Sequence, residues 1–206
     1  TPSAFANSVS LHPIADASLM SVAPDNNNGG EAWVLAGVTQ NFTTNRGLFR
    51  FDLTAEIPPN AIIQSASLIL EVTRQPPVND YNSALFSLHR VLRSWGEGNQ
   101  LAIDNNGGQG ALAKAGEVTW NHRYAFTSET WAAPGGAAGM DYLASPSSQG
   151  FINGTADSPY AFPSTPALVA DVQQWAGNPL ANFGWLLKCS SEDINWTSLR
   201  FGSRED

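Results

Sequence analysis

The chain has 206 residues, of which 42% are hydrophobic and 14% are charged, and its formal net charge is −8. This length favours one domain with a substantial core, and the acidic balance argues against nucleic acid as a partner, because phosphate binding needs clustered Lys and Arg. No run approaches the roughly 18 consecutive apolar residues of a membrane span. The single cysteine, Cys189, excludes an intrachain disulfide and Cys-based metal sites.

The first eleven residues read "TPSAFANSVSL". Ala4-Phe5-Ala6 has the small-x-small form of a signal-peptidase site, so export and an ordinary Ala-rich leader both remain open. Phe5, Val9 and Leu11 share one face of an extended chain, which makes residues 1–8 an extension that could act as a donor strand. Three N-x-[ST] sequons are compatible with a secreted or cell-surface location: they lie at Asn41, Asn153 and Asn195.

Apolar and polar side chains alternate in four segments: 46–53, 62–72, 84–92 and 182–189. This period of two predicts strands with one buried face and one solvated face, which is typical of antiparallel sheets. Pro- and Gly-rich turn signals separate the segments. We therefore expect a single all-β domain over residues 1–206, an antiparallel jelly-roll β-sandwich.

One segment breaks this alternation. Leu168, Val172 and Trp175 recur at helical spacing and predict a short α-helix near residues 166–176. Ser164 or Thr165 can cap its start, and Gly177 with Pro179 marks its end. Two further stretches, 96–116 and 132–163, are rich in Gly, Asn, Ala or Ser and are expected to be long loops.

The residues that could support catalysis do not form a recognisable pattern. His12, His89 and His122 lie in no Ser/His/Asp or Cys/His context, and we place His89 on an outward strand face. Cys189 falls on the apolar side of its strand and is expected to be a buried structural thiol. No pair of carboxylates stands out as a dyad. The sequence therefore predicts a protein that is not an enzyme.

The loop "PDNNNGGE", residues 24–31, offers oxygen ligands of the kind that calcium prefers. Asp25, Asn27 and Glu31 are the candidate ligands, although the spacing does not match an EF-hand, and Asn-Gly clusters are more often plain turns. Calcium is the one cofactor for which the sequence gives a reason.

Sugar binding relies on exposed aromatic rings, and the chain has seven tryptophans. Four of them lie in periodic or motif contexts and are expected in the core: Trp95, Trp120, Trp175 and Trp185. The candidates for an exposed platform that stacks on a polysaccharide are Trp33, Trp131 and Trp196. For each of these three, partly buried packing is the competing interpretation.

Taken together, ordered motifs along nearly the whole chain resemble the DNRLRE-domain family of bacterial secreted and surface proteins, closest to versions that carry a PEP-CTERM tail. The motifs are "DASLMSVAPDNNNGG", "RGLFRFDL", "IPPNAIIQSASLILEV", "LHRVLRSWGEG", "EVTWNHR", "WAAPGG", "LVADVQQWAGNPLANFGWLLK" and "RFGSRED". The resemblance implies a jelly-roll sandwich, export and no catalytic residues. It also implies either a carbohydrate-binding module or a surface or matrix protein. Arg46, Arg50, Asp52, Trp95 with Glu97, and Trp120 with Asn121 are expected to be structural.

Family members continue past the Ser-Arg-Glu segment into another strand, whereas this sequence stops at Asp206. Residues 199–206 are therefore expected to form a penultimate edge strand. The missing neighbour could be trimmed, replaced within the chain, or supplied by another copy through strand donation. We expect a non-catalytic structural or adhesive module that contacts copies of itself and could assemble into a fibre. A carbohydrate-binding module is the alternative.

Overall fold

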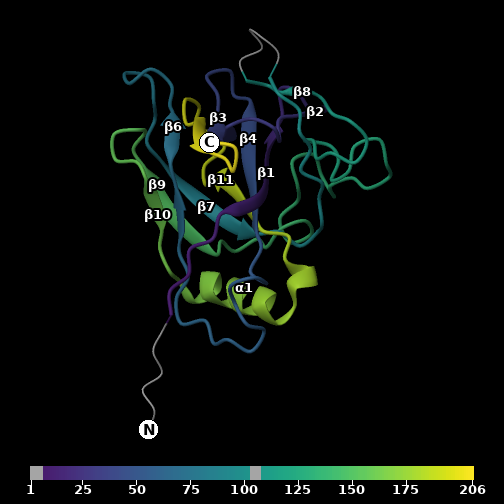
Figure 1. Cartoon of the computed structure of the whole chain (residues 1–206). Coiled ribbons are helices and arrows are strands. Elements are labelled where there is room, and N and C mark those ends of the chain that lie inside the picture. The colour runs from purple at the N-terminus through teal and green to yellow at the C-terminus, as the bar shows by residue number, and fades with distance from the viewer. Residues whose placement is uncertain (1–6, 103–107) are drawn as a thin grey trace.

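The computed structural model describes residues 7–102 and 108–206. Strands dominate this part of the chain, and one α-helix follows the tenth strand (Figure 1). The elements are β1 (Pro13–Met20), β2 (Asn26–Asn27), β3 (Trp33–Val38), β4 (Thr44–Phe51), β5 (Leu68–Leu70), β6 (Val72–Arg74), β7 (Ala84–Arg90), β8 (Ala111–Leu112), β9 (Ser148–Ile152), β10 (Tyr160–Phe162), α1 (Pro166–Gly177), the 3-10 turn η1 (Pro179–Ala181), β11 (Trp185–Cys189) and β12 (Leu199–Gly202).

In the described residues, eight strands form one curled antiparallel sheet in the order β6-β12-β3-β4-β11-β7-β9, and β1 pairs with β4. The curl begins where β3 leaves β4 after two paired positions. Gly37 permits this departure, because its φ is +109° and a Cβ there would lie 2.3 Å from the carbonyl oxygen of Thr197. The two halves of the curled sheet therefore face each other, and β5 with β10 extends the second half.

The main core fills the space between these halves. Phe86 of β7 meets Phe201 of β12 with ring centroids 5.7 Å apart, and both side chains are fully buried. Phe49 and Leu187 come from the first half, and Phe162 comes from β10. The predicted all-β antiparallel sandwich is confirmed, since the inward side chains are those that the alternation marked.

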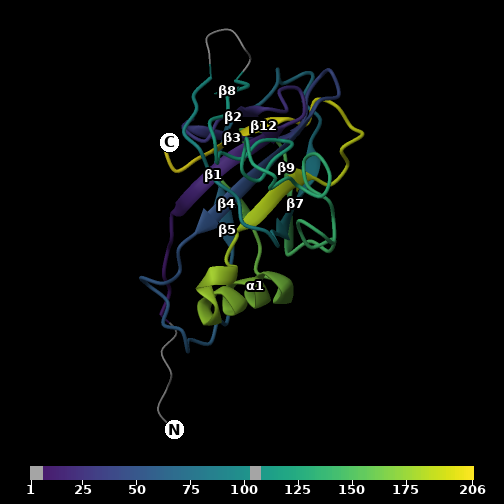
Figure 2. The ribbon, with the colours of Figure 1, turned by 90° about the vertical axis from the view of Figure 1, so that its right-hand side faces the viewer.

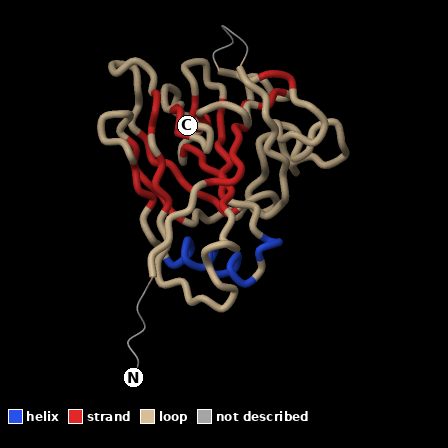
Figure 3. The backbone as a smooth tube through the Cα atoms, viewed as in Figure 1, coloured by secondary structure: helices blue, strands red, loops and turns tan. Residues whose placement is uncertain are grey.

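A second core lies on the other face of the first half. Leu48 of β4 and Leu186 of β11 point away from the main core and pack with Trp95, Trp131 and other buried residues. The chain between β7 and β9 covers this face and consists mostly of loops, which Figure 3 shows beside the strands. The expectation that each strand has one solvated face is therefore wrong for these central strands, which are buried on both faces.

The helix α1 spans Pro166–Gly177, as the sequence predicted. The side chain of Thr165 caps it by accepting a hydrogen bond from the backbone N–H of Leu168 at 3.0 Å. The helix lies across one end of the sandwich (Figures 1 and 2). Trp175, fully buried, packs its ring against that of Trp185 at 4.5 Å and so closes this end of the core.

Two predicted boundaries need correction. Residues 62–67 form no strand, because side chains take their backbone donors: Ile63 donates to Gln173 of α1 and Ala66 donates to Ser164. The stretch 132–163, expected to be a loop, contains β9 and β10. These two strands are short, and the Gly and Pro residues around them hide the alternation of apolar and polar side chains.

Candidate functional site

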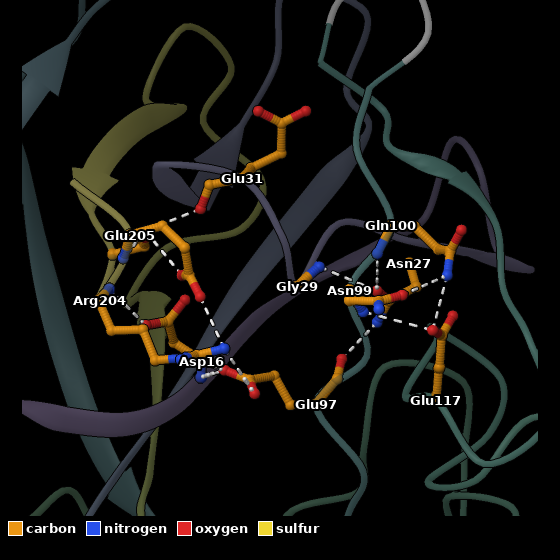
Figure 4. A network of polar contacts seen from close by, with 11 residues as sticks. Asp16, Asn27, Gly29, Glu31, Glu97, Asn99, Gln100, Glu117, Arg204 and Glu205 are labelled. Carbon is orange, nitrogen blue, oxygen red and sulfur yellow. Dashed lines mark hydrogen bonds and ion pairs between the residues drawn. The ribbon is translucent and has the colours of Figure 1, made fainter.

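Four polar residues from three distant segments of the chain meet at the edge of β1 that faces away from β4 (Figure 4). The backbone N–H of Asp16 donates to Glu97 Oε1 at 2.8 Å, and the backbone N–H of Arg204 donates to Asp16 Oδ2 at 2.8 Å. The Arg204 guanidinium also pairs with Glu97 at 2.7 Å and with Glu205 at 2.7 Å. One arginine thus neutralises part of a cluster that holds three carboxylates.

This arrangement changes the acidity of Asp16, which is 1% exposed. Burial raises the pKa of Asp16 to about 7, and the nearby charges of Glu205 and Glu97 act in the same direction. The hydrogen bond from the Arg204 backbone and the charge of Arg204 oppose the rise. Asp16 is therefore a buried carboxyl group that titrates near neutral pH.

The neighbouring half of the network is centred on Asn27, which is fully buried. Its Nδ2 donates to the carbonyl oxygens of Glu97 at 2.6 Å and Val118 at 2.9 Å. Its Oδ1 accepts from the backbone N–H groups of Gly29 and Gln100. Both lone pairs of this oxygen are engaged within the chain, so Asn27 offers no free oxygen to calcium in this conformation and its amide fixes the loop.

The two other candidate calcium ligands lie in separate contacts. Asp25 is exposed and accepts from Asn121 Nδ2 at 3.0 Å, whereas Glu31 accepts from the backbone of Ala102. Glu117, close to Asn27, is occupied by Lys114 and Gln100. In residues 7–102 and 108–206, no three His, Cys, Asp or Glu side chains come together as a metal site.

The three tryptophans considered for sugar stacking have different surroundings. Trp131 is 4% exposed and donates from Nε1 to the carbonyl oxygen of Thr119, so the prediction of an exposed platform is wrong for it. Trp33 is half-buried, and the guanidinium of Arg200 lies 4.0 Å from the centre of its ring. Trp196 is also half-buried and has a φ of 61°. The three do not form one platform.

The motif residues on β4 contact the covering loops. Arg46 makes a two-point ion pair with Glu192 at 2.8 and 2.7 Å, and donates to the carbonyl oxygens of Gly135 and Gly136. Its guanidinium also lies 5.5 Å from the ring centre of Trp120. The sequence suggested a structural role for Arg46 but gave no sign of Glu192, its partner 146 residues away.

Other motif residues follow the same pattern. The guanidinium of Arg50 lies over the ring of Trp95 at 5.2 Å, and Trp95 Nε1 donates to the carbonyl oxygen of Phe183 at 2.9 Å. Asp52 is exposed and holds the turn at Thr54 through its carboxylate. These contacts connect the sheet to its loops and leave the motif side chains engaged within the chain.

His89 is buried and lies under the 142–147 segment, so its predicted position on an outward solvated face is wrong. Its ring nitrogens contact the carbonyl oxygen of Leu143 at 2.8 Å and Ser87 Oγ at 2.9 Å. Burial is the main cause that lowers the pKa of His89, which favours the neutral ring. Cys189 is also fully buried, and burial raises the pKa of its thiol.

The strand β12 does not lie at an edge. It pairs with β3 on one side and with β6 on the other. After it, Ser203 Oγ donates to the carbonyl oxygen of Glu31 and the chain turns toward Asp16. The expectation that residues 199–206 form a penultimate edge strand is therefore wrong, because the chain itself supplies both neighbours of β12.

The edge of β1 is closed by side chains. Glu97 accepts from the N–H of Asp16, and Asn28 Oδ1 accepts from the N–H of Ser18 at 2.8 Å. Ser18 Oγ in turn accepts from the N–H of Leu35 in β3. These contacts occupy the donors that another strand would need.

The edge at β9 is different. β9 pairs with β7 alone among the described strands. The carbonyl oxygen of Leu85 in β7 accepts a hydrogen bond from the N–H of Ser190, next to β11, and so points away from β9. Phe151 lies opposite Leu85 in the antiparallel pair, and its backbone groups therefore point away from β7. Phe151 is 62% exposed and Leu85 is 39% exposed. At the two ends of this edge the segment around β10 makes contact, because the N–H of Asn153 donates to Tyr160 Oη at 3.0 Å and Ser148 Oγ donates to the carbonyl oxygen of Pro163 at 2.7 Å. Among the described residues, the middle of the edge, at Phe151, is the part that presents unpaired backbone groups beside an apolar pair.

The predicted assembly residues lie before β1. Val9 is 44% exposed, whereas Leu11 packs against the main core, and Phe5 lies outside the described residues. Residues 7–12 belong to no strand. Two of the predicted glycosylation sequons have exposed asparagines, Asn41 and Asn153, and Asn195 is half-buried.

No helix in the described parts of the chain is long and apolar enough to cross a membrane. Comparisons of the sequence with protein-family models and with curated proteins found no match.

Proposed function

We propose that this protein is a non-catalytic structural module that associates with copies of itself through the middle of the β9 edge, at Phe151. The observation that carries the proposal is the exposed pair of Phe151 and Leu85 beside outward-facing backbone groups of β9. An exposed apolar edge strand is a template for pairing with another extended chain.

The partner segment that we propose is the N-terminal stretch of a second copy, residues 1–10. Phe5 and Val9 recur on one face of this stretch when it is extended, and Val9 is 44% exposed. Leu11 packs on its own core and so limits the donor to the residues before it. Pairing would cover Phe151 and satisfy the edge of β9 at the same time.

One feature supports a DNRLRE-type module as the setting for this assembly. The residues that carry the resemblance, among them Asp16, Arg46, Trp95 and Arg204, are engaged in contacts that join strands to loops. A scaffold stabilised in this way needs no disulfide. Fractionation of the producing cells tests the predicted secreted or cell-surface location, and recovery of the protein in the cytoplasm alone would refute it.

The assembly test uses light scattering and electron microscopy on the full chain. Phe151→Lys places a charge on the edge and is expected to abolish oligomers, as is deletion of Thr1–Ser8. Ile62→Lys is the matched control, because Ile62 is 85% exposed and lies outside the edge. A wild-type protein that stays monomeric, or F151K that assembles as well as I62K, would refute the proposal. Assembly that survives the deletion would refute the N-terminal donor.

A further inference from the structure

Two arginines face each other on the outer surface of the second half of the sheet. Arg200 of β12 lies directly opposite Arg74, the last residue of β6. Arg74 is exposed and Arg200 is half-buried, whereas the adjacent pair of Val72 and Phe201 points into the main core. Like charges at opposed positions of an antiparallel pair repel each other. The pair therefore weakens the sheet unless an anion lies between the two side chains.

This pair differs from most other basic side chains of the protein. Six of the ten lysines and arginines form ion pairs with carboxylates of the described residues: Arg46, Arg90, Arg93, Arg123, Lys188 and Arg204. Within the same part of the chain, neither Arg74 nor Arg200 has such a partner, although the sequence holds 18 acidic residues. Glu31, whose charge acts on Arg200, accepts a hydrogen bond from the backbone N–H of Ala102.

The guanidinium of Arg200 is supported by its neighbours. It lies 4.0 Å from the centre of the Trp33 ring, which stabilises its position on that side. Gly108 lies beside its terminal nitrogen Nη2, where a Cβ would come within 2.7 Å, so a glycine leaves space that a side chain would fill. Burial is the main cause that lowers the pKa of Arg200, and the charge of Arg74 acts in the same direction. The two guanidinium groups are therefore close enough to act on one ligand.

We propose that Arg74 and Arg200 together bind the phosphate group of a phosphate monoester. Such a group carries a charge of about −1.5 to −2 at pH 7 and has three strong acceptor oxygens, which matches two cations that reach it from two strands. A carboxylate or a phosphodiester carries a single negative charge and would leave half of the positive charge uncompensated. The site therefore selects against the diester backbone of nucleic acids. This inference is independent of assembly through β9.

Titration followed by nuclear magnetic resonance tests the site with methyl phosphate, dimethyl phosphate and sulfate as probes. At pH 7.5, methyl phosphate and sulfate should bind more tightly than dimethyl phosphate, which carries one charge. At pH 5, methyl phosphate should bind more weakly, because its second pKa is about 6 and it takes up a proton, whereas sulfate stays a dianion and should keep its affinity. The reporter is the indole N–H signal of Trp33, which packs on Arg200 and is assigned by its loss in Trp33→Phe.

Variants of the two arginines complete the test. Arg74→Gln should weaken the binding of methyl phosphate about tenfold, which corresponds to roughly 1.4 kcal/mol. Lys114→Gln is the matched control, since it removes an equal charge at an exposed site, and it should leave the affinity unchanged. Arg200→Gln should abolish binding, and if that variant fails to fold, R74Q and the comparison of probes still decide the question. No binding of methyl phosphate, equally tight binding of dimethyl phosphate, or the same affinity in R74Q and K114Q would overturn the proposal.

Discussion

Glu97 Oε1 accepts hydrogen bonds from the backbone N–H of Asp16 at 2.8 Å and from Arg204 Nε at 2.7 Å (Figure 4). The three residues are separated by 81 and 107 positions along the chain. One carboxylate therefore closes the edge of β1 and fixes the segment that follows β12. A strand at this edge would have to displace Glu97.

Glu97→Ala should lower the free energy of unfolding by about 1–3 kcal/mol, because it leaves the buried N–H of Asp16 without an acceptor. Arg204→Ala should cost less, at most about 1 kcal/mol, because the Arg204 side chain is 39% exposed and solvent screens its ion pair. Urea unfolding measures both. Glu56→Ala, at an exposed site, is the control, and equal losses in the Glu97 and Arg204 variants would contradict the assigned roles.

The titration of Asp16 should make the protein less stable as the pH rises. The pKa of Asp16 is about 7 in the folded chain and 3.8 as the ordinary value. Between these values the folded state binds more protons than the unfolded state. The stability that the protonated Asp16 contributes is therefore complete at low pH and is lost as the pH rises through 7. Asp16→Asn keeps an acceptor for Arg204 and should remove this dependence. Unfolding at pH 5 and pH 8 provides the measurement, and an unchanged slope in D16N would contradict the assignment.

Arg46→Lys should destabilise the protein strongly, by about 2–4 kcal/mol. A lysine cannot make the two-point pair with Glu192 and reach the carbonyl oxygens of Gly135 and Gly136 at once. The Glu192 side chain is 19% exposed, so its carboxylate is poorly solvated, and Lys188 at 3.3 Å offers it only a single-point contact. Thermal unfolding compares R46K with Arg74→Lys, an exposed control. Similar melting temperatures for the two variants would show that the network is dispensable.

The sequence predicted the sandwich and the helix because both depend on local periodicity. Phe49, Phe51 and Trp185 alternate with polar residues, and all three lie in the main core. The sequence analysis did not predict the second core. Its signal was the apolar side chains of Leu48 and Leu186, which interrupt the polar face of the strands in "GLF" and "WLLK". The partners of Arg46 and Asp16 could not be predicted, since they depend on how distant loops fold over the sheet.

Cys189 should be unreactive in the native protein. It is fully buried in the main core, and burial raises the pKa of its thiol, which lowers the fraction of the reactive thiolate. A thiol reagent such as dithionitrobenzoate should label it only when the chain unfolds in urea. Rapid labelling of the folded protein would mean that β11 opens locally. Comparison of the labelling with the urea unfolding curve distinguishes local opening from global unfolding.

Asp171 should be the most sensitive residue of the helix. It is 3% exposed and accepts hydrogen bonds at Oδ2 from Trp185 Nε1 at 2.8 Å and from Ser147 Oγ at 2.5 Å, while Oδ1 lies 3.3 Å from Arg90. Asp171→Ala leaves the buried indole N–H of Trp185 without an acceptor and takes the carboxylate away from Arg90, which keeps its contact with Gln174. The loss should be about 2–4 kcal/mol.

Two milder variants separate these contributions. Trp185→Phe removes the indole N–H and should cost about 1–3 kcal/mol, whereas Asp171→Asn keeps an acceptor oxygen but loses the charge that faces Arg90. The double variant W185F/D171A should cost less than the sum of its parts, since the two residues share one hydrogen bond. Urea unfolding gives the free energy of unfolding of each variant. Near-ultraviolet circular dichroism reports how Trp175 packs against the side chain at position 185. Additive losses would contradict a direct bond between α1 and β11.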